Sequence, residues 1–148
     1  MTTIDPFRLL LRVRYGECDA QGIVYNARWI EYVDIAASEY TRVLFGSVDA
    51  ATTGIDWRLV KQTCEWHAPG RFDDVLDIRV RTVRVGTTSF ALATEIRRHG
   101  AADALVTVET IYVAFDPKTW SKQAISPAHR EALERGAPGV VVNQAAVS

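Results

Sequence analysis

An aspartate, a glycine and the start of a helical pattern stand close together near the amino end of this sequence. Asp19 lies in a polar stretch, Gly22 introduces a bend, and apolar residues begin to recur with helical spacing at about Tyr25. The first turn of a helix presents unpaired backbone N–H groups and a partial positive charge, so it binds anions and stabilises a developing oxyanion. A carboxylate a few residues before such a helix end predicts half of an acyl-transfer site.

Other reactive residue types near this stretch receive structural interpretations. Glu17, two residues before Asp19, is interpreted as a solvated loop glutamate rather than as a second acid. Cys18 is interpreted as a buried thiol rather than as a nucleophile, because no histidine lies near it in the sequence. The three histidines of the chain have no mutual spacing that suggests metal ligands, so neither a metal nor another cofactor is predicted.

Composition restricts the class of protein. The chain has 148 residues, of which 48% are apolar and 24% charged, and this is the balance of a soluble globular domain. The formal net charge of −1 predicts no nucleic-acid or membrane partner, and two cysteines are too few for a disulfide framework. The amino end lacks a signal-peptide pattern, and no apolar run is long enough to cross a membrane. We therefore expect one cytoplasmic domain over residues 1–148.

The elements that would position Asp19 can be read from the periodicity on either side of it. Residues 7–15 alternate as a half-buried strand, and residues 16–24 form a loop. A long helix is predicted from about residue 25 to residue 45, because its apolar residues recur at three- and four-residue steps. Asn26 suits the N-cap, and Gly46 suits the position just past the carboxyl end.

Strand-like stretches follow a polar connecting loop at residues 47–54. They are separated by turn-forming residues and span residues 55–68, 74–85, 88–98 and 104–115. Residues 118–125 are either a loop or a short terminal strand. A short helix is predicted over residues 127–135 with Ser126 as its N-cap, and residues 136–148 are expected to be a loose or partner-docked tail.

This order of elements predicts an α+β fold. Strands joined by hairpins form an antiparallel sheet, and a long helix with one apolar stripe needs a broad surface to cover that stripe. We therefore expect the sheet to curl around the helix. One sheet face and the edge strands would remain uncovered, which predicts oligomerisation.

The stretch around Asp19 also carries a family resemblance. This chain resembles the hotdog-fold thioesterases, and specifically the 4-hydroxybenzoyl-CoA thioesterase family. The family signature is matched by the run YGECDAQGIVYNARWIEYVDIAASEY. The family pattern D-x-x-G-I/V-V-Y/F is matched by Asp19, Gly22, Ile23, Val24 and Tyr25. The resemblance extends over roughly residues 10–115. It implies a five- or six-stranded antiparallel sheet wrapped around one long central helix, assembled as homodimers or as dimer-of-dimers tetramers that hydrolyse acyl-CoA.

The resemblance also implies roles for individual residues. Asp19 takes the position of the catalytic acid, which either attacks the thioester carbonyl to give a mixed anhydride or deprotonates a water molecule. Asn26 takes the position whose backbone N–H polarises that carbonyl. Gly22 and Tyr25 would lie beside the substrate. The structural alternative is that Asp19 is a turn acid that caps its own loop.

The remaining parts of an acyl-CoA would meet two further regions. Asp34, one step from the apolar stripe of the helix, would contact a polar acyl group such as a phenol, unless it forms a salt bridge or lies in an interface. The CoA phosphates are expected at the turn of the second hairpin, where Thr87, Thr88 and Ser89 supply hydroxyl and backbone N–H groups. Arg84, Arg97 and Arg98 lie near that turn and are interpreted as a solvated strand edge.

The function predicted from the sequence is therefore hydrolysis of an acyl- or aryl-CoA thioester to free acid and CoA. The alternative from another class is a non-catalytic acyl-CoA-binding or assembly protein on the same scaffold. A hotdog hydratase or dehydratase ranks lower, because these enzymes need an Asp–His or Glu–His pair and no histidine follows Asp19 where the helix begins.

Overall fold

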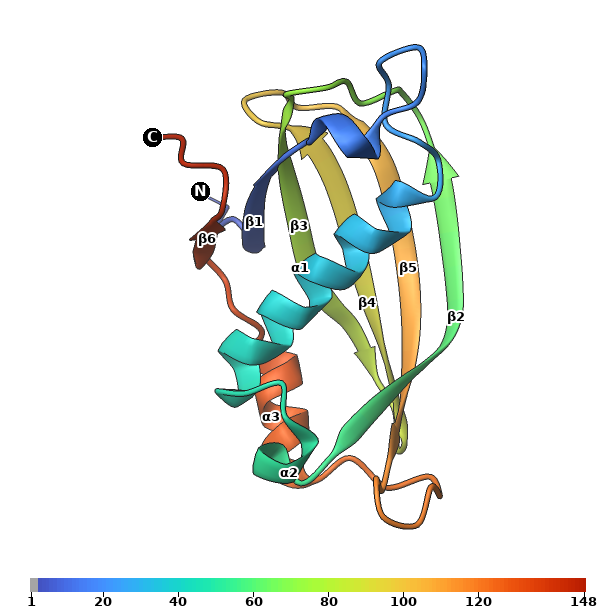
Figure 1. Ribbon diagram of the computed structural model, residues 1–148. Helices are drawn as coiled ribbons and strands as arrows, with labels where there is room; N and C mark the ends of the chain where they lie inside the picture. Colours follow the sequence, from blue (N-terminus) through green and yellow to red (C-terminus); the bar gives the residue numbers. More distant parts are fainter. Residues whose placement is uncertain (1–2) are drawn as a thin grey trace.

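The computed structural model describes residues 3–148, which build one six-stranded sheet and a long helix (Figure 1). The order of strands in the sheet is β2-β5-β4-β3-β1-β6. No helix among the described residues is long and apolar enough to cross a membrane. In chain order, the elements are β1 (Phe7–Arg12), a 3-10 turn (Tyr15–Glu17), α1 (Arg28–Phe45), α2 (Ala50–Thr53), β2 (Asp56–Trp66), β3 (Val75–Val85), β4 (Ser89–Arg98), β5 (Ala104–Phe115), α3 (Pro127–Arg135) and β6 (Val141–Asn143).

The sheet curls around α1, which crosses one of its faces diagonally (Figure 1). Neighbouring strands are antiparallel except for β1 and β6, which run parallel. This arrangement confirms the predicted α+β hotdog fold. The strands β2 to β5 and the helix α3 begin and end close to the predicted residues, because the turn residues between them break the alternation of apolar side chains.

The core lies between α1 and the sheet face that it covers. Apolar residues recur every three or four positions along α1, which places one buried stripe against the sheet. Each strand contributes alternate side chains, so Leu76, Ile78 and Val80 of β3 are all buried. Truncation of such a side chain to alanine typically costs about 2–5 kcal/mol. The buried residues of α1 are Trp29, Tyr32, Val33, Ala36, Ala37, Tyr40 and Leu44.

The start of α1 differs from the prediction, and its end agrees. The helix begins at Arg28, and its N-cap is Ala27, which has helical backbone angles and no capping side chain. Asn26 is therefore not the N-cap. The physical reason is that the N–H of Tyr25 donates to the carbonyl of Glu17 at 3.0 Å. This hydrogen bond holds the backbone at Tyr25 in the loop, so the helix begins three residues later, at Arg28. Gly46 ends the helix as predicted, with a φ of 76° and its N–H bonded to the carbonyl of Arg42.

The carboxyl-terminal segment differs from the prediction. Residues 136–148 are not a loose tail, because β6 pairs in parallel with β1 and Ala145 is buried. Leu10 lies on the same side of β1 as Arg8 and Arg12, yet it is only 5% exposed, and its carbonyl accepts a hydrogen bond from the N–H of Gln144 in that tail. The first strand also ends earlier than predicted, at Arg12, and Tyr15 is 83% exposed.

The two edges of the sheet differ from each other. The edge at β6 is formed by a strand of only three residues, whereas the edge at β2 is eleven residues long. Leu59 and Val60 of β2 are 46% and 55% exposed. The loop predicted before β2 contains the single turn α2, which begins where Asp49 accepts a hydrogen bond from the N–H of Ala51. A four-residue helix is too short to give a periodic signal.

Candidate active site

Asp19 lies at the start of a tight turn that returns on itself before α1. The N–H of Asp19 donates to the carbonyl of Ile23 at 2.8 Å, and the N–H of Gly22 donates to the carbonyl of Asp19 at 3.0 Å. Gly22 has a φ of 76°, a conformation that side chains disfavour. The turn is closed by a bridge between Cys18 and Val24. Gly22 therefore provides the predicted bend, and the turn fixes the backbone of Asp19.

The side chain of Asp19 is exposed and partly engaged by its own turn. Its Oδ1 accepts hydrogen bonds from the N–H groups of Gln21 at 2.8 Å and of Ile23 at 3.4 Å. Oδ2 has no partner within residues 3–148. The carboxylate thus caps its turn, as the structural alternative predicted, and it also presents one oxygen to solvent. These hydrogen bonds restrict the rotamer of the group that a reaction would use.

Glu17 is a buried anchor, so its interpretation as a solvated glutamate was wrong. Its Oε1 accepts hydrogen bonds from the backbone N–H of Arg14 at 2.8 Å and from the hydroxyl of Tyr32 at 3.0 Å, and its Oε2 accepts from the Arg14 guanidinium. Burial raises the pKa of Glu17, but the hydrogen bonds from Arg14 and Tyr32 outweigh burial and hold it below its ordinary value. With its lone pairs engaged, Glu17 is a structural residue and not a second acid.

The backbone N–H groups just before α1 are available to a ligand. The N–H of Tyr25 is bonded to Glu17 and that of Arg28 to the carbonyl of Tyr25 at 2.8 Å. Between them, Asn26 and Ala27 are exposed, and within the described part of the chain their N–H groups have no acceptor. Because Glu17 binds Tyr25 and Tyr32 together, these amides and the loop of Asp19 form one connected unit.

The neighbouring thiol is unsuited to nucleophilic attack. Cys18 is half-buried, and its Sγ lies 3.8 Å from the carbonyl oxygen of Arg14. Burial raises the pKa of this thiol, and the negative charges of Glu17, Asp19 and Asp74 raise it further. A raised pKa reduces the fraction of reactive thiolate.

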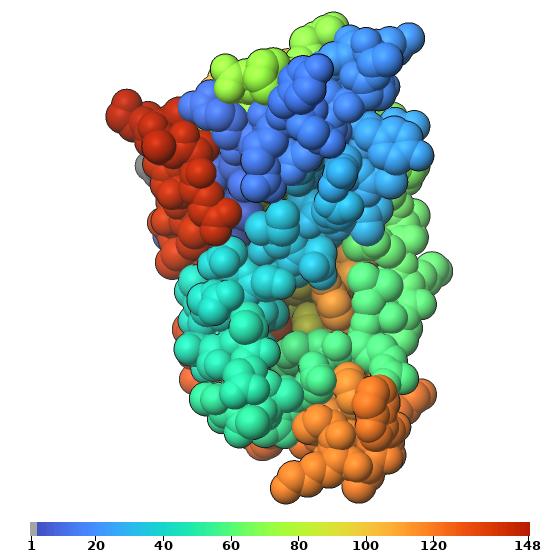
Figure 2. All heavy atoms as spheres, in the orientation of Figure 1, coloured from blue at the N-terminus to red at the C-terminus, as the bar shows by residue number. Residues whose placement is uncertain are grey.

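Asp34 lies at the rim of a hollow between α1 and β2, visible as a recess in the surface (Figure 2). The hollow has a volume of about 180 Å³ and contains Tyr112 of β5 on its far side. Burial, followed by the negative charge of Asp34, raises the pKa of Tyr112 to about 12. Within residues 3–148, Asp34 has no salt-bridge partner. Asp34 therefore lines a pocket, and its contact with a polar acyl group stays a prediction.

The residues predicted to hold phosphate lie at the other end of the molecule. Thr87 and Thr88 form the turn between β3 and β4, opposite the end of the sheet that carries the loop before α1 (Figure 1). The N–H of Gly86 donates to the carbonyl of Ser89 at 2.6 Å. Arg130 of α3 donates to the carbonyl of Gly86, also at 2.6 Å, and so links the turn to α3. A single chain therefore does not bring Thr87, Thr88 and Ser89 to Asp19.

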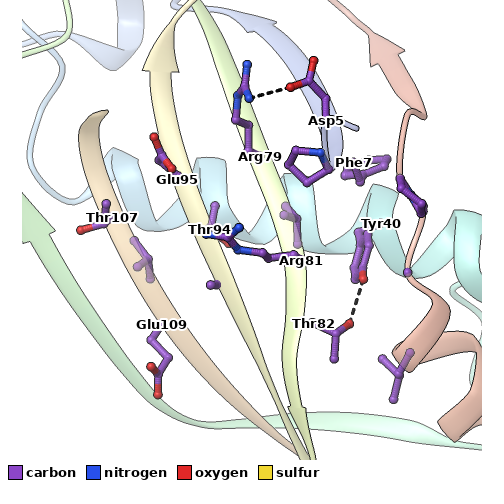
Figure 3. Close-up of a pocket in the computed structure, with 18 of the residues that line it drawn as sticks. Asp5, Phe7, Tyr40, Arg79, Arg81, Thr82, Thr94, Glu95, Thr107 and Glu109 are labelled. Atoms are coloured by element: carbon purple, nitrogen blue, oxygen red, sulfur yellow. Dashed lines mark hydrogen bonds and ion pairs between the residues drawn. The ribbon is translucent and has the colours of Figure 1, made fainter. Parts of the chain in front are cut away.

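A larger hollow contains none of the predicted site residues. It has a volume of about 750 Å³ and lies on the sheet face that points away from α1 (Figure 3). Its lining combines both charge signs: Asp5 binds Arg79 at 3.1 Å, and Glu95 binds Arg97. This is the sheet face that was expected to remain uncovered.

Comparison with known proteins assigns the chain to a family. A family model described as the thioesterase superfamily matches residues 21–104, which is more than half of the chain. This chain belongs to the thioesterase superfamily. The match begins two residues after Asp19 and includes Gly22, Asn26 and Asp34. The thioesterase is therefore a thioester hydrolase of hotdog fold, as the resemblance implied.

Individual relatives agree with this assignment. The thioesterase is 30% identical over 121 residues to the acyl-CoA thioester hydrolase YbgC of Escherichia coli, covering 80% of this chain and 89% of YbgC. Its fold is similar to that of a hypothetical protein from Aquifex aeolicus, with 22% identity, a TM-score of 0.78 and coverage of 86% of this chain and 99% of that chain. It is also similar to a 1,4-dihydroxy-2-naphthoyl-CoA thioesterase from Synechocystis, with 19% identity, a TM-score of 0.77 and coverage of 86% and 94%.

Two features of this thioesterase's site were missed by reasoning from sequence. The Glu17–Tyr32 contact joins residues 15 positions apart, and the signal for it was a tyrosine on the buried stripe of α1, whose hydroxyl needs a partner. The support of the β3–β4 turn by Arg130 had no local signal. Of the arginines expected near the turn, Arg84 lies 3.5 Å from the Ser89 hydroxyl, whereas Arg97 and Arg98 pair with Glu95 and Asp74.

Proposed function

We propose that this thioesterase hydrolyses an acyl- or aryl-CoA thioester to the free acid and CoA, with Asp19 as the catalytic carboxylate. The observation that carries the proposal is that an exposed, hydrogen-bonded carboxylate precedes exposed amides just before α1, whose N–H groups have no acceptor among residues 3–148. The names of two relatives, which specify acyl-CoA and naphthoyl-CoA thioesters, support CoA as the carrier.

The thioester carbonyl would lie against the N–H groups of Asn26 and Ala27. As the carbonyl carbon becomes tetrahedral, its oxygen becomes negative, and these two donors together with the positive end of α1 stabilise it. Loss of one such donor typically costs about 100- to 1000-fold in rate.

Asp19 would form the new bond or prepare the water that forms it. In the first route, Oδ2 attacks the carbonyl carbon, the C–S bond breaks, and CoA leaves as a thiolate that takes a proton from water. Water then hydrolyses the mixed anhydride and restores the carboxylate. In the second route, Asp19 removes a proton from a water molecule as that water attacks the carbonyl carbon directly. The C–S bond then breaks, and the CoA thiolate takes the proton from Asp19. Both routes consume one water molecule and release the acid and the thiol.

Further residues would bind the parts of the substrate on either side of the carbonyl. Gly22 leaves room beside the turn, and the ring of Tyr25 is exposed beside the amides. Asp34 would accept a hydrogen bond from a hydroxyl on the acyl group. Thr87, Thr88 and Ser89 would bind CoA phosphates.

The separation of these residues within one chain supports a site shared between two copies. The loop before α1, to which Asp19 belongs, and the β3–β4 turn, to which Thr87 belongs, lie at opposite ends of the sheet (Figure 1). An antiparallel pairing of two β2 edges would reverse one copy, place its β3–β4 turn near the other copy's Asp19 and cover Leu59 and Val60. The charged outer face in Figure 3 would then pair two dimers into a tetramer.

Free thiol release across a panel of acyl- and aryl-CoA substrates tests the proposed function. We expect turnover by the native chain and a loss of about 100-fold or more in kcat for both Asp19→Ala and Asp19→Asn. Asp103→Asn is the matched control, because Asp103 is an exposed loop aspartate outside the site. Tight CoA-ester binding without turnover would indicate the non-catalytic alternative. Full activity of Asp19→Ala would overturn the proposal.

A further inference from the structure

The hollow beside Asp34 has a floor of aromatic side chains from three adjacent strands. Trp57 of β2, Phe90 of β4 and Tyr112 of β5 line it. Phe90 and Tyr112 are register partners whose rings stack at 5.3 Å, and the ring of Trp57 meets that of Phe90 edge-on at 4.8 Å. The floor is therefore a continuous cluster of contacting aromatic rings.

The opposite wall is open because α1 carries small residues there. Ala37, Ser38 and Thr41 face the aromatic floor, and their short side chains leave the space between helix and sheet unfilled. The far end is closed by the connection from α1 to β2, with Val48, Thr53 and Ile55 in the lining. The hollow is thus a pocket that is open towards the surface between α1 and β2 (Figure 2).

Trp57 is a fixed wall of this pocket. Its ring stacks on that of Phe45 at 5.6 Å and lies edge-on to those of Phe90 at 4.8 Å and His129 at 6.2 Å. A ring held by three others cannot rotate aside without breaking these contacts, so it limits what enters.

The size of the pocket decides what fits. An apolar cavity of about 150 Å³ in a protein interior is sufficient to bind benzene. The volume here, about 180 Å³, is therefore enough for one aromatic ring or a short chain. Asp34 lies six residues after Arg28, the first residue of α1, which is about 9 Å along the helix axis. The candidate oxyanion amides of Asn26 and Ala27 lie just before that start.

We propose that this pocket receives the acyl group, and that Trp57 determines specificity by admitting a single ring or short chain and excluding long chains. This inference rests on the proposed function and names its substrate class. Removal of the Trp57 ring would extend the pocket towards Phe45, and a larger side chain at Ser38 would fill it from the helix side.

The test compares kcat/KM for acetyl-, benzoyl-, hexanoyl- and dodecanoyl-CoA in matched variants. For the native chain, we expect dodecanoyl-CoA to be at least about tenfold poorer than benzoyl-CoA, since pocket fit of this kind discriminates by about 10- to 200-fold. Trp57→Ala should raise the ratio of dodecanoyl- to benzoyl-CoA by about tenfold or more. Trp120→Ala, which removes an exposed tryptophan outside the pocket, should leave the ratio unchanged.

Ser38→Leu keeps the test decisive if Trp57→Ala does not fold. It should lower kcat/KM for benzoyl-CoA by about tenfold and that for acetyl-CoA much less. An identical chain-length profile in the native chain and both variants would overturn the inference. If no thioester is hydrolysed, the proposed function fails separately, and calorimetric binding of benzoate and dodecanoate to the native chain and to Ser38→Leu still tests the pocket. Equal binding in both would then overturn it.

Discussion

The hydroxyl of Tyr32 donates a hydrogen bond to Oε1 of Glu17 at 3.0 Å and thereby ties the loop of Asp19 to the second turn of α1. The same glutamate accepts the N–H of Tyr25 through its backbone carbonyl. The candidate carboxylate and the candidate oxyanion amides are therefore positioned by one buried residue that takes no part in the chemistry.

Removal of the Tyr32 hydroxyl should weaken this tie. Tyr32→Phe leaves a buried carboxylate oxygen with one donor fewer, so we expect the free energy of unfolding to fall by about 1–3 kcal/mol. Urea denaturation at pH 7 measures the loss, and thioester turnover should fall with it. Tyr15→Phe, which changes an exposed tyrosine, should shift stability by less than about 0.5 kcal/mol. Equal effects of the two substitutions would contradict the anchoring role.

Acid should destabilise the fold through two buried carboxylates. Burial opposes ionisation of Glu17 and Asp77, yet Arg14 and Tyr32 for Glu17, and Arg8 and Arg79 for Asp77, hold both pKa values below their ordinary values of 4.5 and 3.8. A lowered folded-state pKa contributes stability above the unfolded-state pKa that is lost as pH falls through the folded-state value. We expect the melting temperature to fall steeply below about pH 4.5.

Substitution of Glu17 separates its contribution to the loss of stability in acid from that of Asp77. Glu17→Gln should be less stable than the native chain at pH 7 and should lose less stability between pH 5 and pH 3, since the group no longer titrates. Thermal unfolding followed by circular dichroism over this range measures both effects. Parallel pH profiles for the two proteins would show that Glu17 does not contribute to the acid transition.

Substitution of Gly22 and of Gly46 separates the effect of backbone strain on stability from the effect of the Asp19 turn on activity. Both glycines have a φ of 76°, and no atom of residues 3–148 lies within 4 Å of an added Cβ, so alanine at either should cost about 1–2 kcal/mol in stability. Only Gly22→Ala alters the turn of Asp19, and we expect it alone to lower kcat/KM, by about tenfold or more. Equal activity of the two variants would show that the turn does not orient the carboxylate.

Gly70 permits the close approach of a loop to the aromatic core. A Cβ at this position would lie 2.7 Å and 2.9 Å from two ring atoms of Trp29, which is itself buried. Gly70→Ala should therefore cost about 1–3 kcal/mol through overpacking. Gly16→Ala is the matched control, because in the described part of the chain no atom lies within 4 Å of its added Cβ. Urea denaturation compares the stability of the two variants. Similar midpoints would mean that the Trp29 side chain moves to accommodate the added methyl group without loss of stability.

Elements with strong periodicity were predictable from the sequence, whereas features that depend on distant partners were not. The alternation in β3 and β4, the repeat of α1 and the capping residues Ser126 and Gly46 are all local signals, and the structure agrees with them. The start of α1 was misplaced because it is decided by the contact of Tyr25 with Glu17, and the tail was misjudged because β6 needs β1, more than 130 residues away, to become a strand.

In the candidate site too, residues with local sequence signals could be predicted and residues that depend on distant partners could not. Asp19 and Gly22 could be selected because a turn, an acid and a helix start follow one another directly in the chain. The role of Glu17 could not, since burial and the Tyr32 hydroxyl decide it and both come from the packing of α1. Likewise, Trp57 and Tyr112 looked like ordinary strand residues until three strands brought their rings beneath the helix.

The short parallel pairing of β6 with β1 has a consequence for how copies of this chain can add to one another. Of the two edges of the sheet, one is the three-residue strand β6, and the other is the eleven-residue strand β2, whose outward-facing backbone N–H and C=O groups have no partner strand among residues 3–148. If copies could pair through both edges of the sheet, they would form an open-ended fibre. A pair of copies joined through β2 leaves only the two three-residue β6 edges exposed, and so short an edge strand disfavours further pairing into fibres.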